Sequence, residues 1–119
     1  MAILKNIDAE AVLSLPALVH AEPGQIVSRT LAQNRSVSIT LFAFAEGEEI
    51  STHDSDGDAM VTVLEGTGRF TVDGTEYFCR AGETLVMPAK KPHSVFAPEP
   101  FKMLLTVVFP TVKPQIKAH

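Results

Sequence analysis

The sequence predicts an all-β protein built as a single antiparallel sandwich or barrel. Apolar and polar residues alternate with a period of two in several runs, which is typical of strands with one buried face. Gly, Pro and Asp residues separate these short runs, and no strong helical pattern interrupts residues 36–109. Short strands at this spacing indicate a sandwich or barrel. A chain of 119 residues is the size of one domain, so we expect residues 1–119 to fold as a unit.

The first third of the chain predicts a short helix followed by an edge strand. Residues 8–15 read DAEAVLSL and favour a helix, with Asp8 as the N-cap and Pro16 as the residue that ends it. Residues 25–33 read QIVSRTLAQ and suit an edge strand. Because an open strand edge tends to pair with another chain, we expect a homodimer.

Seven further strands are expected after residue 35. Asp73-Gly74 predicts a tight hairpin, since a type I′ turn needs positive φ at both of its central residues. Gly66 and Gly82 are expected in turns as well. The tail 111–119 is expected to add a last edge strand or to fray. The seven strands are expected near residues 36–45, 59–65, 69–72, 75–80, 84–88, 92–97 and 101–109.

Composition excludes several classes of partner. The formal net charge is −4 and no basic cluster exceeds Lys90-Lys91, so neither a nucleic-acid nor an anionic membrane partner is expected. No apolar run approaches the roughly 20 residues that span a bilayer. Residues 11–21 are apolar but lack a basic segment before them, which argues against a secretory signal. The single cysteine, Cys79, allows no intrachain disulfide, so we expect a cytoplasmic protein.

Two blocks of sequence carry a family resemblance. The first runs from Gly47 to Gly66 as GEEISTHDSDGDAMVTVLEG, and the second covers residues 82–97 as GETLVMPAKKPHSVFA. They resemble the two signature motifs of the cupin superfamily, in the form found in small single-domain bacterial cupins. The spacing agrees at Gly47, His53, Gly66, Gly82, Pro88 and His93.

The resemblance implies an antiparallel cupin barrel, also described as a double-stranded β-helix or a jelly-roll-like barrel. It also implies that the side chains of His53 and His93 point into one internal cavity. Ser55 is expected beside His53 on the same strand face, and Met60 is expected to contribute to the ligand pocket.

The metal motif is degenerate. Family metal centres usually have three His and one Glu, but Ser55 stands at the second His position and Ala59 or Met60 at the Glu position. Lys90 and Ala97 replace the Gly and Asn of the second motif. Of the four expected ligands only His53 and His93 remain, and two imidazoles alone leave a divalent ion mostly hydrated.

A weakly held divalent metal, Zn, Ni or Fe, therefore needs a further ligand. Asp56 or Asp58 is the candidate, because Gly57 between them can break the strand alternation that turns Asp54 outward. The alternative is that these carboxylates form a solvated acidic loop. Lys90-Lys91 are expected at the barrel mouth, and Cys79 is expected to be an inert thiol.

Two functions compete at this point. The first is a sensor or carrier that binds a small polar or sugar-like compound without a complete metal centre, as the missing ligands suggest. The second is a cupin enzyme of the isomerase, lyase or dioxygenase class, with His53 or His93 as catalytic acid or base or as metal ligands. The retained histidine pair favours it, although no carboxylate that orients either ring is identifiable.

Overall fold

Residues 3–110 are described by a computed structural model of the chain. In this part of the chain nine strands form two antiparallel sheets. One sheet has the order β1-β2-β9-β4-β7 and the other has the order β3-β8-β5-β6. The strands are β1 (Ile26–Gln33), β2 (Val37–Phe44), β3 (Glu49–His53), β4 (Asp58–Glu65), β5 (Thr67–Val72), β6 (Thr75–Arg80), β7 (Thr84–Met87), β8 (His93–Phe96) and β9 (Phe101–Val108).

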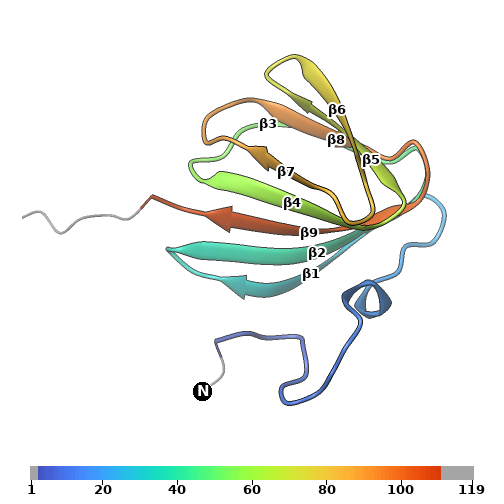
Figure 1. The fold of residues 1–119 in the computed structure, drawn as a ribbon, viewed down its shortest axis with the longest axis vertical. Helices are drawn as coiled ribbons and strands as arrows, with labels where there is room; N and C mark the ends of the chain where they lie inside the picture. The colour runs from blue at the N-terminus through green and yellow to red at the C-terminus, as the bar shows by residue number, and fades with distance from the viewer. Residues whose placement is uncertain (1–2, 111–119) are drawn as a thin grey trace, which may run out of the picture.

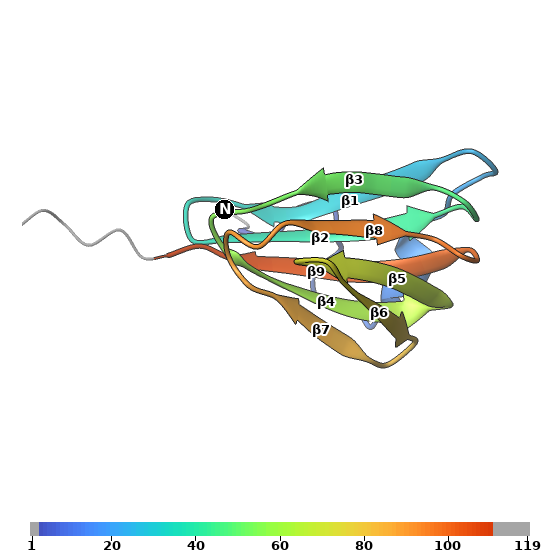
Figure 2. The same ribbon diagram turned by 90° about the horizontal axis from the view of Figure 1, so that it is seen from above.

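The two sheets face one another and enclose the core (Figures 1 and 2). Strand alternation decides which side chains point inward. On β4, the side chains of Ala59, Val61 and Val63 are buried between the sheets, whereas Met60 is 43% exposed on the outer face. The fold expected from the sequence, all-β with antiparallel strands, is confirmed.

Aromatic side chains fill one end of the space between the sheets. The rings of Phe44 and Phe101 stack with their centroids 4.6 Å apart, and Phe70 meets Phe101 edge to face at 6.1 Å. All three are buried. Full burial of one such side chain contributes about 1.5–3 kcal/mol, and aromatic pairs add to this. This cluster closes the barrel at the end where β9 begins.

The strands expected after residue 35 are confirmed to within two residues at each end. The hairpin at Asp73-Gly74 is present, with φ of 49° and 86°, and Gly66 and Gly82 have φ of 73° and 88° in their turns. The edge strand expected at 25–33 corresponds to β1. The sequence did not predict β3, which is short and mostly exposed.

The helix expected over residues 8–15 is wrong. Residues 8–14 have no regular structure, and Glu10 among them has a φ of 58°. The only helical turn among the described residues is a 3-10 helix, Leu15–Leu18, in which Pro16 lies at the start. Proline suits the first turn of a helix because that N–H has no intrahelical partner. Of residues 8–15, Leu15 packs on the outer face of the five-stranded sheet, whereas the side chain of Val12 is fully exposed.

The N-terminal segment also covers part of the free edge of β1. The backbone N–H of Lys5 donates to Leu31 O at 2.8 Å, and the side-chain amide of Asn6 donates to Thr30 O at 2.8 Å. The edge is therefore less open than the sequence suggests. The tail 111–119 lies outside the described residues.

Gly66 and Gly82 allow a matched test of backbone constraint. Both have positive φ, but a Cβ on Gly66 would overlap the carbonyl oxygen of Pro100, whereas a Cβ on Gly82 would meet nothing. Gly82→Ala should cost about 1–2 kcal/mol of unfolding free energy from the left-handed conformation alone. Gly66→Ala should cost at least about 1 kcal/mol more, because the chain must also shift. Equal losses in urea unfolding would contradict this assignment.

The homodimer stays a prediction. β1 lies at the edge of its sheet, which is where a second chain would pair. Light scattering at micromolar concentration should give twice the monomer mass of 12.9 kDa. A monomer mass over the whole concentration range would show that the cover provided by Lys5 and Asn6 is enough to protect the edge.

Candidate functional site

A cavity of about 230 Å³ lies between the sheets, beyond the aromatic end of the core. It is lined from both sheets, mainly by apolar side chains that alternate along β9 and its neighbours. The lining residues are Phe42, Ile50, His53, Ser55, Ala59, Met87, His93, Val95, Met103, Leu105 and Val107.

The two histidines of the sequence motifs meet in this cavity. His53 ends β3 and pairs directly with His93, the first residue of β8. Their ring centroids are 4.4 Å apart, with the planes inclined at 69°. His93 is buried, with 5% of its surface exposed, and His53 is exposed at the mouth. The cavity is thus open to solvent on the side of His53 and enclosed on the side of His93.

Each imidazole is oriented by a backbone carbonyl two residues before it. His53 Nδ1 lies 2.9 Å from Ser51 O, and His93 Nδ1 lies 3.1 Å from Lys91 O. A carbonyl oxygen only accepts, so each Nδ1 carries the proton and donates it. The Nε2 atom of a neutral ring then holds a lone pair. Neither Nε2 has a hydrogen-bond partner among residues 3–110.

Burial lowers the pKa of His93 below its usual value of 6.5. The nearby ring of His53 acts in the same direction, while the hydrogen bond to Lys91 and the charge of Asp54 oppose it. Burial dominates because a charged imidazole loses its hydration inside the cavity. His93 is therefore neutral at physiological pH and presents a hydrogen-bond acceptor at Nε2.

Ser55 lines the cavity from the loop after β3 and not from the strand itself, and Met60 does not line the cavity. Ser55 lines the cavity, and its hydroxyl accepts a hydrogen bond from the N–H of Gly57 at 3.1 Å. The expectation that Met60 lines the pocket is wrong, because its side chain points outward from β4 and is 43% exposed. Ala59, one residue earlier, faces the cavity instead.

The acidic residues do not complete a metal site. Asp58 accepts a hydrogen bond from the N–H of Ala89 at 2.8 Å, and Asp56 lies 3.7 Å from Lys90 Nζ in an exposed ion pair. Neither lines the cavity. In residues 3–110, no three His, Cys, Asp or Glu side chains are grouped to hold a metal ion. Two imidazoles do not fit the three or four ligands of a durable metal site, so we derive no chemistry through a metal.

The remaining candidate residues lie elsewhere. Cys79 is buried, and burial followed by the charge of Glu83 raises its pKa, which agrees with an inert thiol. Lys91 forms an ion pair with Asp73 at 3.2 Å on the loop before β8.

Sequence reasoning missed most of the apolar lining. Phe42 on β2 and Leu105 on β9 point into the cavity. Which face of its strand each side chain takes can be assigned only once the register of the strand is known. Met87 and Met103 pack both in the core and against the cavity. Ile50 belongs to β3, the strand that the sequence did not predict.

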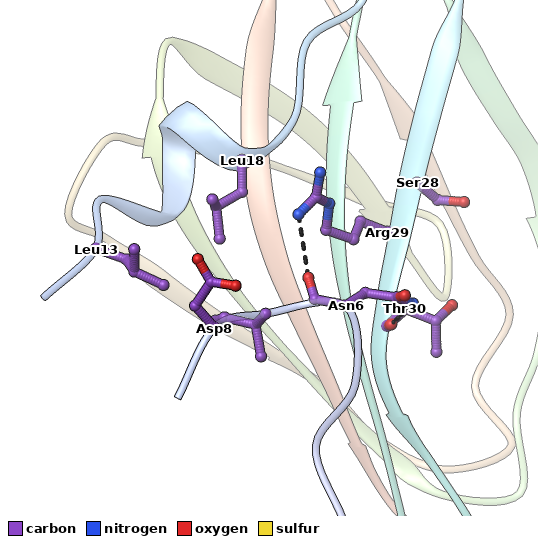
Figure 3. Close-up of a pocket in the computed structure, with 8 residues that line it drawn as sticks. Asn6, Asp8, Leu13, Leu18, Ser28, Arg29 and Thr30 are labelled. Carbon is purple, nitrogen blue, oxygen red and sulfur yellow. Dashed lines mark hydrogen bonds between the residues drawn. The ribbon is translucent and has the colours of Figure 1, made fainter. Parts of the chain in front are cut away.

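A second, larger cavity of about 650 Å³ lies between the N-terminal segment and β1 (Figure 3). Its one cationic side chain, Arg29, donates from Nη1 to the backbone oxygen of Asn6 at 3.0 Å. Asn6, Asp8 and Ser28 in its wall are exposed. This cavity is a broad crevice on the surface, and its Arg29 side chain is already hydrogen-bonded to the N-terminal segment. We therefore place the functional site at the histidine cavity.

Comparison with known proteins decides the family. Residues 40–109 match the Cupin domain family. The chain belongs to the cupin family. Among proteins with curated functions, none matches this cupin.

Several solved structures resemble most of this cupin. A conserved protein of unknown function from Streptococcus pyogenes is 45% identical, with a TM-score of 0.92, over 94% of this chain and 98% of that one. A cupin superfamily protein from Desulfitobacterium hafniense is 35% identical, with a TM-score of 0.87, over 92% and 100%. A cupin 2 conserved barrel domain protein from Leptotrichia buccalis is 40% identical, with a TM-score of 0.79, over 81% of this chain and 47% of that one.

No helix among residues 3–110 of this cupin is long and apolar enough to cross a membrane.

The lowered pKa of His93 predicts a pH-dependent stability. Because the unfolded chain binds this proton more readily, His93 contributes stability above pH 6.5 that is lost as the pH falls through the lower folded-state pKa. In urea unfolding, the wild type should lose more stability than His93→Gln between about pH 7.5 and about pH 5. His20→Gln, which removes an exposed imidazole, should keep the wild-type dependence. Equal losses in wild type and His93→Gln would refute the assignment.

Proposed function

We propose that this cupin binds a small organic molecule in the cavity between His53 and His93 and acts as a sensor or carrier. The observation that supports this most is the pair of histidines that line the cavity, each with its Nδ1 bonded to a backbone carbonyl and its Nε2 without a partner among residues 3–110. Both atoms reach solvent, because neither is among the buried polar atoms that lack a partner, and a ligand that takes the place of this solvent can donate a hydrogen bond to them.

The shape of the site supports the same proposal. Ligand sites are concave and mostly apolar, with a few polar groups that fix orientation. Here the polar groups are the two imidazoles and Ser55, all near the mouth or on the wall formed by β3 and β8. The aromatic cluster of Phe44, Phe70 and Phe101 closes the far end, so a ligand enters past the exposed ring of His53.

An enzyme is the second candidate, and the neutral state of His93 favours it. A buried neutral imidazole with a free Nε2 has the form of a general base. Its Nδ1, however, donates to the Lys91 carbonyl and not to a carboxylate that would stabilise the imidazolium after proton uptake. The orientation therefore serves recognition better than proton transfer.

The double variant His53→Ala/His93→Ala tests the proposal. A fragment library is screened by NMR, and compounds that shift the side-chain resonances of the two histidines are taken as ligands. These ligands should lose at least about tenfold in affinity for the double variant, because a hydrogen bond in a buried site is removed with each ring. Circular dichroism should show the same β-sheet spectrum.

The control is His20→Ala, which removes an imidazole outside the cavity. It should bind every ligand as the wild type does. A library with no compound that shifts His53 or His93, or ligands that bind the double variant with unchanged affinity, would overturn the proposed function.

A further inference from the structure

We infer that the ligand of the histidine cavity is a small neutral molecule with a single-ring or branched aliphatic body and one hydroxyl group that donates a hydrogen bond to a histidine Nε2. This inference rests on the proposed function, because it assumes that the cavity binds a ligand. It narrows the ligand from small organic molecules in general to one chemical class.

The polarity of the lining sets the body of the ligand. Eight of the eleven lining residues are apolar. The wall contributed by β2, β4, β7 and β9 has no polar side chain: it consists of Phe42, Ala59, Met87, Met103, Leu105 and Val107. A sugar-like compound would leave several hydroxyls unpaired against this wall, at about 1–3 kcal/mol each. The wall therefore favours a hydrocarbon face.

The polar groups of the site are gathered on the opposite side. His53 and His93 are a directly opposed pair on β3 and β8, and Ser55 follows shortly after β3. A ligand that satisfies both walls has one apolar face and one polar end. One hydroxyl is enough, because the two rings lie only 4.4 Å apart and both line the same cavity.

The charges around the cavity select a neutral ligand. No Lys or Arg lines it, so a carboxylate or phosphate would find no cation, and no Asp or Glu lines it to receive an ammonium group. Burying an unpaired ion is costly in such a site. Since both Nδ1 atoms already donate to carbonyls, the atoms left to the ligand are acceptors, and the ligand must supply the donor.

The volume limits the size of the ligand. A dry apolar cavity of about 150 Å³ in another protein holds one benzene ring. At about 230 Å³ this cavity has room for one ring with small substituents or for an aliphatic chain of similar bulk. A disaccharide exceeds it.

Four probe compounds test the inference. Each is titrated into the full chain, and binding is measured by calorimetry and by the shifts of the histidine NMR resonances. p-Cresol and toluene differ by one hydroxyl; benzoate adds a charge, and xylose replaces the apolar body with a polyol. p-Cresol should bind about tenfold more tightly than toluene, because the hydroxyl gains a hydrogen bond to Nε2. Benzoate and xylose should bind more weakly than p-cresol.

Variants test the polar wall and the apolar wall of the cavity separately. In His53→Ala/His93→Ala the preference for p-cresol over toluene should disappear while toluene still binds, since the apolar wall is unchanged. Leu105→Asn should weaken p-cresol and toluene alike, because it places an amide in the wall opposite the histidines.

Two different failures are distinguishable. Equal binding of p-cresol and toluene by the wild type, or tighter binding of xylose or benzoate than of p-cresol, would overturn the inference. If the inference fails in this way but library compounds still shift the NMR resonances of His53 and His93, the proposed function stands. If neither these probes nor any library compound shifts either histidine, both fall together.

Discussion

The hydrogen bond from each histidine Nδ1 to the carbonyl two residues before it determines what the cavity can bind. These bonds, His53 to Ser51 and His93 to Lys91, fix the ring orientation and assign the proton to Nδ1. The direct pairing of β3 with β8 then brings the two rings together. A lone pair at Nε2 can bind a metal or accept a hydrogen bond. Because Ser55 and Ala59 stand where further metal ligands are expected, the pair is left with the role of hydrogen-bond acceptors.

The barrel supports this pair by dividing its interior into a filled part and an open part. At the beginning of β9, Phe101 stacks on Phe44 and closes the interior. Further along the same strand, Met103 and Leu105 line a cavity. A small chain buries a limited core, so a cavity of this size removes contacts that would otherwise stabilise the fold. Retaining two polar rings at its edge is easier to understand as recognition than as packing.

Sequence patterns predicted the strands with clear alternation and the glycine turns, and they placed His53 and His93 together because motif spacing fixes strand position. They failed where tertiary contacts decide. Residues 8–15 have helical propensity, but that preference is weak in a short segment that does not bury an apolar helix face: Leu15 packs on the sheet, and Val12 is fully exposed. Met60 points outward because of the residue at which β4 resumes its alternation after the Gly57 loop, and motif spacing alone does not determine that residue. The same holds for Asp56 and Asp58, whose partners come from the loop before β8.

The central claim is that His93 is a neutral ring with its proton on Nδ1 and a free lone pair at Nε2 in the cavity. Long-range proton–nitrogen NMR of ¹⁵N-labelled protein at neutral pH measures this directly, because protonated and unprotonated ring nitrogens differ widely in chemical shift. The account predicts a protonated Nδ1 and an unprotonated Nε2 for His93. A proton on Nε2, alone or with one on Nδ1, would contradict it.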